Sequence, residues 1–390
     1  MWLVFLLVLV FFAYGVFEYR RHSYNINQIP IRIHINGTRG KSSVTRLIGG
    51  GLKDGNKRVF IKTTGSRPRI IDIDGNEFPI GRVGAANIIE QLKITRQAVV
   101  DKAEYFIVEC MALFPGLQYI TEHQMVRSQV GIITNIREDH LDVMGPLVED
   151  VADAICNTIP KNGILFTAET RFLEMIQKRA SALGTKVIRV NPESISAEDL
   201  SGLSYLEHKD NMAIALAVCE HFGVDKKSAL KGMYAIKSDF GSMKKYTLKI
   251  NDKTIEFINA FAANDPDSYR TIWEMFHLHR NADKKLIVLI NSRRDRIQRA
   301  EQLGELIARE LEGDYFIVCG EYTHPLVHRA IKSGLSPDLI KDMRKNSIDE
   351  IFNFIYDLTI KESMVIGIGN IVGLGEEIVG YFVNKGRMVA

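Results

Sequence analysis

Ile31-Arg-Ile-His-Ile-Asn-Gly-Thr-Arg-Gly-Lys-Ser-Ser-Val-Thr-Arg46 is the stretch of sequence that decides the fold. Isoleucine alternates with other residues over positions 31–35, which predicts a β-strand. Gly37 and Gly40 then predict a turn, and Lys41 begins a predicted helix that ends near the three glycines at 49–51. A strand, a glycine-containing turn and a helix in this order are typical of a loop that binds phosphate groups.

The residues of this turn suit a nucleotide. Glycines let backbone N–H groups point at phosphate oxygens, and a helix N-terminus adds positive potential. Lys41 can neutralise the β- and γ-phosphates, and the Ser42 hydroxyl can reach a magnesium ion. The spacing lacks the first glycine of the commonest nucleotide loop, where Ile35 stands. Because a strand precedes the turn and a helix follows it, we favour nucleotide binding over an ordinary turn.

Length and charge narrow the class of protein. A chain of 390 residues predicts two or three domains of ordinary size. The formal net charge of +3 gives no sign of a nucleic-acid partner. The cysteines lie far apart in mostly apolar runs, with no Cys-x-x-Cys pair, at Cys110, Cys156, Cys219 and Cys319. We therefore expect buried free thiols and a reducing compartment.

The amino terminus differs from the rest of the chain. Residues 1–17 carry no charge and are almost wholly apolar. Such a run is at the short end of the roughly 17 to 25 residues that cross a bilayer. A cleaved signal peptide is the alternative, but the positive charge follows the apolar run and no Ala-x-Ala site is evident. We predict an uncleaved single-pass anchor over residues 1–19, with Arg20 and Arg21 on the cytoplasmic side.

Strand-like and helix-like segments alternate after the loop. Strands are predicted at 57–62, 105–109, 129–135, 163–167 and 186–190, and helices at 86–102, 150–158 and 169–183. This order predicts a parallel sheet with helices on both faces, and ligands collect at the carboxyl ends of such strands. The residues at that edge are the phosphate loop, Thr63, Thr64, Glu109 and His140.

Three residues at this edge are candidate metal ligands. Magnesium prefers oxygen ligands and waters, sometimes with one imidazole. Glu109 is the best carboxylate, Ser42 can supply a hydroxyl, and His140 can hold an ion or orient the substrate. The alternatives are an ordinary strand-end charge for Glu109 and an ordinary loop histidine for His140. Because both lie at the edge that carries the phosphate loop, we favour the functional interpretation.

Residues from about 247 repeat the alternating pattern. Strands are predicted at 254–259, 285–291, 315–319 and 364–368, with helices at 268–279, 298–311 and 346–359. This predicts a second, smaller doubly wound sheet that closes on the first domain. Arginines flank the predicted strand ends of both domains, and their guanidinium groups bind carboxylates in a bidentate manner. The candidates for substrate binding are Arg67, Arg69, Arg293, Arg294 and Arg296, with solvated loop charges as the alternative.

Three motifs together are specific for one superfamily. Asn-Gly-Thr-Arg-Gly-Lys-Ser at 36–42, Thr-Asn-Ile-x-x-Asp-His-Leu-Asp at 134–142 and Asp-Asn-x-Ala-x-Ala at 210–215 resemble the central domain of Mur ligases and folylpolyglutamate synthases. Residues 259–268 resemble the start of the carboxy-terminal domain in the same ligases. The resemblance covers roughly residues 30–390. It implies an α/β fold with a P-loop central domain over 28–246 and a Rossmann-like carboxy-terminal domain over 247–390, preceded by one transmembrane helix.

Within this superfamily, the chain most resembles the ligase subunits of poly-γ-glutamate synthases. The resemblance rests on the anchor, Glu-Cys-Met-Ala at 109–112, His-Leu-Asp-Val-Met-Gly-Pro at 140–146 and Gly-Ile-Gly-Asn-Ile at 367–371. It implies an ATP-dependent amide ligase that polymerises glutamate through γ-linked amides, with an acyl-phosphate intermediate and release of ADP and phosphate. It also implies a multi-spanning membrane subunit and a further anchored subunit as partners, a location at the bacterial cell membrane with cytoplasmic catalytic domains, and a possible homo-oligomer.

The resemblance assigns roles to individual residues. Lys41, Glu109 and His140 are the implied catalytic residues, and Ser42, Glu109 and His140 would hold Mg²⁺, with Mn²⁺ as an alternative. The implied nucleotide-binding residues are Asn36, Gly37, Thr38, Arg39, Gly40, Lys41, Ser42, Ser43, Asn211 and Asn264.

The chain also departs from the family pattern. The family has a nucleotide-contacting arginine after the central domain, and this chain has Ser242 at that position. Many Mur ligases carry a modified lysine where this chain has Ala154. Ala260 occupies the position at which the family's carboxy-terminal motif has an acidic residue, although Asp265 lies nearby. What replaces these groups stays open, as does the choice between D- and L-glutamate. Two other functions remain as alternatives, namely a membrane-anchored ATPase that energises polymer export and a non-catalytic nucleotide-binding scaffold.

Overall fold

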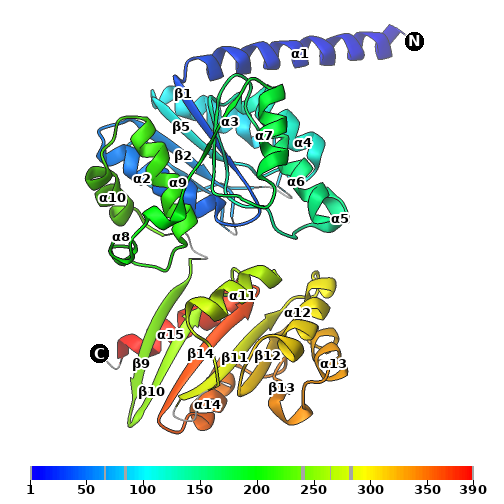
Figure 1. The fold of residues 1–390 in the computed structure, drawn as a ribbon. Helices are drawn as coiled ribbons and strands as arrows, with labels where there is room; N and C mark the ends of the chain where they lie inside the picture. Colours follow the sequence, from blue (N-terminus) through cyan, green and yellow to red (C-terminus); the bar gives the residue numbers. More distant parts are fainter. Residues whose placement is uncertain are drawn as a thin grey trace. The chain divides into compact units, whose positions relative to one another are not determined.

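Two separate units make up the chain (Figure 1). The computed structural model describes residues 2–65, 67–82, 86–238, 242–263, 265–280 and 284–388. The first unit comprises Met1–Leu203 and Glu207–Asp239, and the second comprises Ser204–Leu206 and Phe240–Ala390. The predicted boundary between residues 246 and 247 falls inside β9 (Lys244–Ile250) of the second unit. Each unit has its own sheet and its own hydrophobic core.

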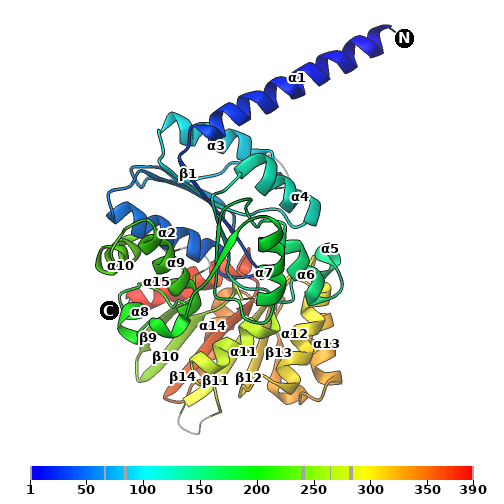
Figure 2. The same cartoon turned by 45° about the horizontal axis from the view of Figure 1, so that its top comes forward.

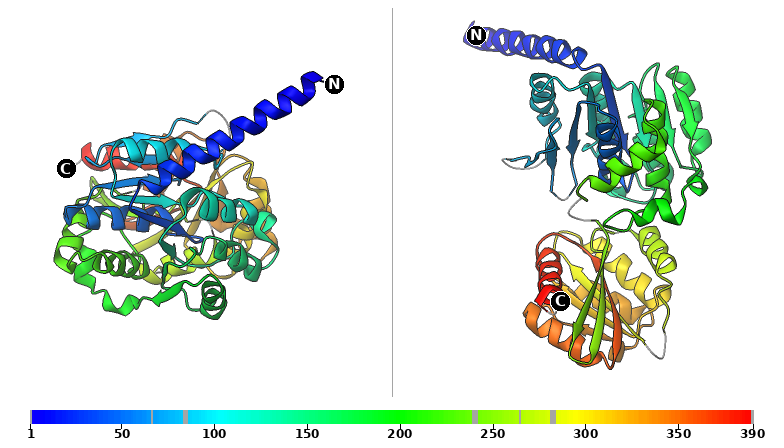
Figure 3. Two further views of the ribbon diagram at one scale, coloured as in Figure 1. Left: turned by 90° about the horizontal axis from the view of Figure 1, so that it is seen from above. Right: turned by 90° about the vertical axis from the view of Figure 1, so that its left-hand side faces the viewer.

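The amino-terminal helix α1 (Trp2–Asn27) has two parts. Its apolar turns are exposed, and by length and composition they can cross a membrane (Figure 3). Its last turns pack on the first unit, where His22 and Ile26 are buried. His22 Nε2 lies 2.7 Å from the carbonyl oxygen of Met125. The predicted apolar helix is therefore present, and it continues without a break into a segment that belongs to the core of the first unit.

A sheet with strand order β4-β3-β2-β5-β1-β6-β7-β8 forms the centre of the first unit. Its long run from β2 to β8 is parallel, and the short edge strands β3 and β4 are antiparallel. The strands are β1 (Ile31–Asn36), β2 (Val59–Thr63), β3 (Arg69–Ile71), β4 (Glu77–Pro79), β5 (Tyr105–Glu109), β6 (Val130–Ile133), β7 (Ile164–Thr167) and β8 (Lys186–Arg189).

Helices cover both faces of this sheet (Figure 2). One face carries α2 (Lys41–Asp54), α9 (Lys209–His221) and α10 (Lys226–Ala235). The other carries the end of α1, α3 (Glu90–Val100), η1 (Thr121–Val126), α6 (Val148–Cys156) and α7 (Leu173–Ala182). The remaining helical segments are α4 (Pro115–Ile120), α5 (Leu141–Met144), η2 (Pro192–Ser194) and α8 (Ala197–Ser201). Because both faces are covered, the central strands are buried on both sides, as parallel sheets require.

The second unit repeats this design on a smaller scale. Its strand order is β13-β12-β11-β14-β10-β9, parallel except for β9. The strands after β9 are β10 (Lys253–Asn259), β11 (Lys284–Ser292), β12 (Tyr315–Gly320), β13 (Ile340–Asp342) and β14 (Glu362–Gly369). One face packs against α11 (Pro266–Met275), α12 (Ile297–Arg309) and α13 (His324–Lys332), and the other against α14 (Ile348–Leu358) and α15 (Leu374–Met388), with η3 (Pro337–Leu339) between α13 and β13.

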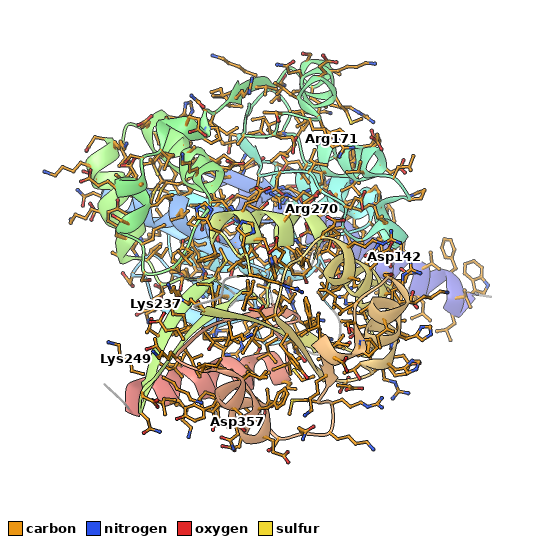
Figure 4. All side chains as sticks on the ribbon, turned by 60° about the horizontal axis from the view of Figure 1, so that its bottom comes forward. Asp142, Arg171, Lys237, Lys249, Arg270 and Asp357 are labelled. Carbon is orange, nitrogen blue, oxygen red and sulfur yellow. The ribbon has the colours of Figure 1, made fainter. Side chains whose placement is uncertain are left out.

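The structure confirms the predicted α/β class with two parallel-rich sheets and an apolar amino-terminal helix. Several local predictions differ from it. Thr63, predicted to lie in a loop, is the last residue of β2, and the predicted helix at 86–102 begins only at Glu90. The antiparallel strands β3, β4 and β9 were not predicted. β3 and β4 have three residues each, too few to show a hydrophobic period, whereas the alternation of Tyr246, Leu248 and Ile250 in β9 was a signal that the prediction missed. Charged side chains such as Arg171, Lys249 and Asp357 are exposed on the surface, where both signs mix (Figure 4).

Candidate active site

The predicted phosphate loop lies between β1 and α2. Gly37 and Gly40 have positive φ angles of 133° and 80°, a region that favours glycine. A Cβ atom on Gly37 would lie 2.1 Å from Thr134 Oγ1, and one on Gly40 would lie 2.5 Å from Asn211 Oδ1. Both positions therefore require glycine for two reasons, the backbone angle and the close neighbour.

Lys41 is the first residue of α2. Its Nζ donates to the carbonyl oxygens of Gly37 at 2.5 Å and of Thr38 at 3.2 Å. Burial lowers the pKa of Lys41, and the nearby Glu109 carboxylate opposes that shift. The ammonium group thus lies inside the loop, at the position from which it can neutralise a bound phosphate.

Glu109, at the end of β5, joins the loop to β2. Its Oε2 accepts hydrogen bonds from Ser42 Oγ at 2.8 Å and from the Thr64 backbone N–H at 2.7 Å. Its Oε1 accepts one from Thr64 Oγ1 at 3.0 Å. Glu109 is only 2 % exposed. Three predicted site residues from separate parts of the chain therefore form one cluster of oxygen atoms beside the phosphate loop.

The loop after β6 holds the other side of the phosphate loop. Thr134 Oγ1 donates to the Arg39 carbonyl at 2.6 Å, and Asn135 Oδ1 accepts from the Arg39 N–H at 3.0 Å. The Thr38 N–H donates to the Asn135 carbonyl at 2.9 Å. The Thr-Asn pair of the second motif thus fixes the backbone of the phosphate loop.

His140 lies further along the same segment, at the start of α5. It has a left-handed backbone with φ of 48°, and its Nε2 is 3.9 Å from Asp139 Oδ1. Asp139 is in turn 3.4 Å from Arg39 of the phosphate loop. The structure therefore places His140 next to Asp139, whereas Ser42 and Glu109 contact each other directly.

Two predicted nucleotide ligands lie behind the loop. Asn36 is 4 % exposed, and its Oδ1 accepts the Gly37 N–H at 2.8 Å. Asn211 of α9 is 3 % exposed, packs against Gly40 and donates to Glu207 Oε1 at 2.7 Å. Both side chains are buried, and each lies against a glycine of the phosphate loop. Ser43 is half-buried in the first turn of α2, and Asn264 lies outside the described residues.

The predicted substrate residues of the first unit differ in their surroundings. Thr64 contacts Glu109, while Thr63 is buried and its Oγ1 has no hydrogen-bond partner within the described part of the chain. Arg67 is exposed on the loop between β2 and β3. Arg69 Nε lies 3.8 Å from Glu77 on the neighbouring strand β4. Arg67 is therefore the more accessible of the two arginines.

The arginines of the second unit gather at the carboxyl end of β11. Arg293 and Arg296 line a small cavity of about 30 Å³, together with Arg299. Arg294 is exposed and is not among the residues that line this cavity. Ser292, 3 % exposed, also lines it, and within the described residues its Oγ has no hydrogen-bond partner.

Sequence reasoning missed Arg299 and the polar residues that support β1. Arg299 lies in the first turn of α12, directly after the predicted arginine cluster, and this position could have identified it. Gln118 hydrogen-bonds to Asn36, and Glu122 hydrogen-bonds to His34. Both lie in the helical segment that follows β5. The sequence did contain a signal, because every second residue of β1 is polar. In a strand that is buried on both faces, such side chains need hydrogen-bond partners from another segment.

The glycine turn, the lysine at the helix N-terminus and the Ser42–Glu109 cluster form a phosphate-binding loop with oxygen ligands beside it, and family comparisons define the class of protein. Residues 35–237 match the Mur ligase middle domain, and residues 245–385 match the poly-gamma-glutamate synthase CapB C-terminal domain. The chain belongs to the CapB family of the Mur ligase superfamily and is an amide-forming ligase, which confirms the resemblance seen in the sequence.

Individual relatives extend over nearly the whole chain. It is 37% identical to the capsule biosynthesis protein CapB of Bacillus anthracis, over 94% of this chain and 79% of that protein. It is 34% identical to the PGA synthase CapB of Bacillus subtilis strain 168, over 97% of both. Among solved structures, E. coli FolC in complex with ADP has a TM-score of 0.68 at 16% identity, covering 94% and 93% of the two chains. MurF from Acinetobacter baumannii has a TM-score of 0.66 at 15% identity, covering 94% and 79%.

Proposed function

We propose that this protein is an ATP-dependent γ-glutamyl ligase that extends a poly-γ-glutamate chain. The observation that carries the proposal is the cluster of Ser42, Glu109 and Thr64 beside the phosphate loop. The relatives called PGA synthase and capsule biosynthesis protein support glutamate as the substrate. A folylpolyglutamate synthase of the same fold, from Yersinia pestis, was solved with AMPPNP and Mn, which supports ATP and a divalent metal.

The oxygen cluster fits a magnesium ion. Ser42 supplies a hydroxyl and Glu109 a carboxylate, both hard oxygen donors, and Mg²⁺ accepts few protein ligands because phosphate oxygens and waters complete its shell. Within the described ranges no three His, Cys, Asp or Glu side chains form a metal-binding group, so the site does not suit a structural zinc ion. Ser42 and Glu109 would hold Mg²⁺, or Mn²⁺, which neutralises phosphate charge. His140 stays a candidate ligand through the loop it shares with Asp139.

The residues of the loop define the roles in the reaction. The γ-carboxylate of the growing chain attacks the γ-phosphorus of ATP, ADP leaves, and an acyl phosphate forms on the substrate. The amino group of the next glutamate then attacks the acyl carbon, phosphate leaves, and the amine loses a proton to give the amide. Lys41 and the N–H groups at the start of α2 stabilise the phosphoryl charge. Positioning and charge neutralisation supply most of the catalysis in such transfers.

The arginine cavity of the second unit suits the carboxylates of this substrate. Arg293, Arg296 and Arg299 line it together with the carboxylate of Asp265, α12 begins beside it, and the Ser292 hydroxyl offers a donor. Guanidinium groups and a helix N-terminus both favour anions. We assign glutamate carboxylate binding to this cavity, and to Arg67 and Arg69 on the first unit.

The apolar part of α1 would serve as a single-pass membrane anchor that keeps the catalytic units in the cytoplasm. Arg20 and Arg21, next to its apolar turns, agree with that orientation. A single anchor provides no channel for a polyanion. Multi-spanning and anchored partner subunits, and self-association, are therefore part of the proposal.

A turnover assay on the full-length protein in membrane vesicles tests this function. ADP release is measured with and without L- or D-glutamate, and the polymer is detected directly. Glutamate-dependent ADP release with polymer formation is expected. Glutamate-independent ADP release without polymer would instead support an ATPase that energises export, no nucleotide turnover would support a scaffold, and AMP as the product would contradict the acyl phosphate.

Replacement of Lys41 is the strongest single change. Lys41→Ala should lower kcat by roughly a thousandfold or more, because it removes the cation beside the transferred phosphoryl group. The fold should persist, since the side chain contacts only carbonyls of its own loop among the hydrogen bonds described above. Lys53→Ala, at the other end of α2, is the matched control and should retain activity. Full activity in Lys41→Ala would rule out this phosphate site.

Replacement of Arg299 tests the carboxylate cavity. Arg299→Gln should raise the KM for glutamate about tenfold and leave the KM for ATP unchanged, because one charged hydrogen bond to a carboxylate contributes about 1.5 to 3 kcal/mol. Arg309→Gln, an exposed position on the same helix that pairs with Glu305, is the control. An unchanged KM for glutamate would remove Arg299 from the substrate site.

A further inference from the structure

The strand that leads into the phosphate loop has an unusual buried polar face. Arg32, His34 and Asn36 occupy alternate positions of β1 and are 9 %, 1 % and 4 % exposed. Side chains at alternate positions of a strand share one face. Buried polar groups are costly unless they are hydrogen-bonded, so this face needs partners from another element.

The continuous helical segment formed by α4 and η1, with the residue that follows it, offers a partner to each of these side chains, and the carbonyls of Ile26 and Ile29 accept further hydrogen bonds from Arg32. Gln118 of α4 hydrogen-bonds to Asn36, Glu122 of η1 hydrogen-bonds to His34 at 2.8 Å, and the carbonyl of Arg127 accepts from Arg32 Nε at 3.0 Å. The order along the helical segment is the reverse of the order along β1. The segment therefore lies along the strand, with Gln118 next to the phosphate loop.

The contact of Gln118 continues into the loop through a chain of amides. Gln118 Nε2 donates to the Leu113 carbonyl at 2.9 Å, which directs its Oε1 toward Asn36. Asn36 Nδ2 donates to Gln118 Oε1 at 2.8 Å, which directs its own Oδ1 toward the Gly37 N–H, also at 2.8 Å. The Leu113 carbonyl thus sets the orientation of the Gln118 amide, and Gln118 in turn sets the orientation of the Asn36 amide.

This chain constrains the first peptide of the phosphate loop. Gly37 has the left-handed φ of 133°, and its N–H points at Asn36 and so cannot point at a ligand. The next two N–H groups of the loop, those of Thr38 and Arg39, are held by Asn135. Thr158 Oγ1 gives Asn36 Nδ2 a second acceptor at 3.1 Å, but Gln118 is the group that holds the amide from the helical segment.

We propose that Gln118 is a positioning residue of the ligase, which acts through Asn36 to hold the phosphate loop in the conformation that binds nucleotide. Gln118 is 1 % exposed, so it is closed to a ligand in solution, and its hydrogen bond to the loop is made through Asn36. The inference rests on the proposed function, because it assumes that the loop binds ATP.

Kinetics of Gln118→Met in the full-length protein test the proposal. The variant keeps the apolar volume but removes the acceptor of Asn36 Nδ2, so the KM for ATP should rise about tenfold while kcat at saturating ATP changes less than about threefold. Gln91→Met on α3 is the matched control, since Gln91 is 1 % exposed and its side-chain amide has no hydrogen-bond partner among the described residues. Its KM for ATP should equal that of the wild type.

Gln118→Glu provides the conservative rescue. A buried carboxyl is driven to its neutral form, which can donate to the Leu113 carbonyl and accept from Asn36 as the amide does. The KM for ATP of Gln118→Glu should therefore be close to wild type, because the acceptor of Asn36 Nδ2 is restored. A merely structural role would lower the melting temperature of both variants without separating their KM values for ATP.

The outcomes separate the two hypotheses. If wild type releases ADP with glutamate and Gln118→Met has an unchanged KM for ATP, the positioning role is wrong and the proposed function stands. If wild type shows no glutamate-dependent turnover, the proposed function itself fails. Should Gln118→Met fold poorly, Gln118→Leu also lacks the acceptor of Asn36 Nδ2, and an unchanged KM for ATP in that variant would also overturn the proposal.

Discussion

The two faces of β1 achieve burial by different physics. Ile33 and Ile35 face the core that α2 and α9 build, and both are fully buried. His34 and Asn36 face η1 and α4, are buried almost as completely, and are held by hydrogen bonds. Apolar contacts are non-directional, so they stabilise the strand without fixing its exact position. Hydrogen bonds are directional, so the polar face fixes where β1 ends and hence where the phosphate loop begins.

Among changes to β1 and its partners, loss of Glu122 should lower the free energy of unfolding the most. Glu122 is 1 % exposed and accepts hydrogen bonds from Ser128 as well as its contact with His34. Removal of one member of a buried ion pair leaves the other uncompensated, so Glu122→Ala should lower the free energy of unfolding by about 4 kcal/mol. Urea denaturation at pH 7 measures it. Glu149→Ala, exposed on α6, is the control, and an equal change in both variants would contradict the role of the buried pair.

Loss of Ile33 tests the apolar face and should have a smaller effect. Ile33→Ala removes buried methyl groups and leaves a cavity, which should lower the free energy of unfolding by about 3 kcal/mol. Ile33→Val should cost about 1 kcal/mol by the same measurement. The KM for ATP should stay unchanged in Ile33→Val, because the apolar face sets stability more than position. A tenfold change in that KM would remove the distinction between the two faces.

The pH dependence of stability should show the smallest effect. Burial alone would lower the pKa of His34, but its interactions with Cys110 and Glu122 outweigh burial and raise the pKa to about 9. A pKa raised above the unfolded value means that this stabilisation is complete below about pH 6.5 and is lost as the pH rises through 9. Wild type should therefore lose more stability than Glu122→Gln between pH 7 and pH 10. Parallel urea curves for the two proteins over that interval would contradict the raised pKa.

Local features of this protein were predictable from the sequence. The phosphate loop, the carboxylate at the end of β5 and the apolar amino terminus each depend on neighbouring residues, and all three occur where the pattern placed them. Glycine at 37 and 40 is required by positive φ angles, which the strand–turn–helix order already implies. Motif order alone was enough to identify the superfamily.

Contacts between distant segments were harder to predict. Asn36 and Asn211 belong to motifs that suggest direct nucleotide contact, yet both side chains are buried behind the loop. Ser42, Thr64 and Glu109 meet because parallel strands end at one edge of the sheet, which the predicted topology did anticipate. Gln118 could not be assigned a partner, since nothing in its own sequence neighbourhood distinguishes it from an ordinary helical glutamine.

The sequence by itself determined that alternate residues of β1 are apolar, that glycines follow them, and that a lysine begins the next helix. The period of a strand assigns its side chains to two faces without any tertiary information. Only the tertiary structure decided that the polar face of β1 packs against a helical segment instead of water, and that Gln118 and Glu122 form hydrogen bonds with it. The reason is physical: local geometry sets the direction of a side chain, whereas its surroundings depend on packing between segments that lie about eighty residues apart in the chain.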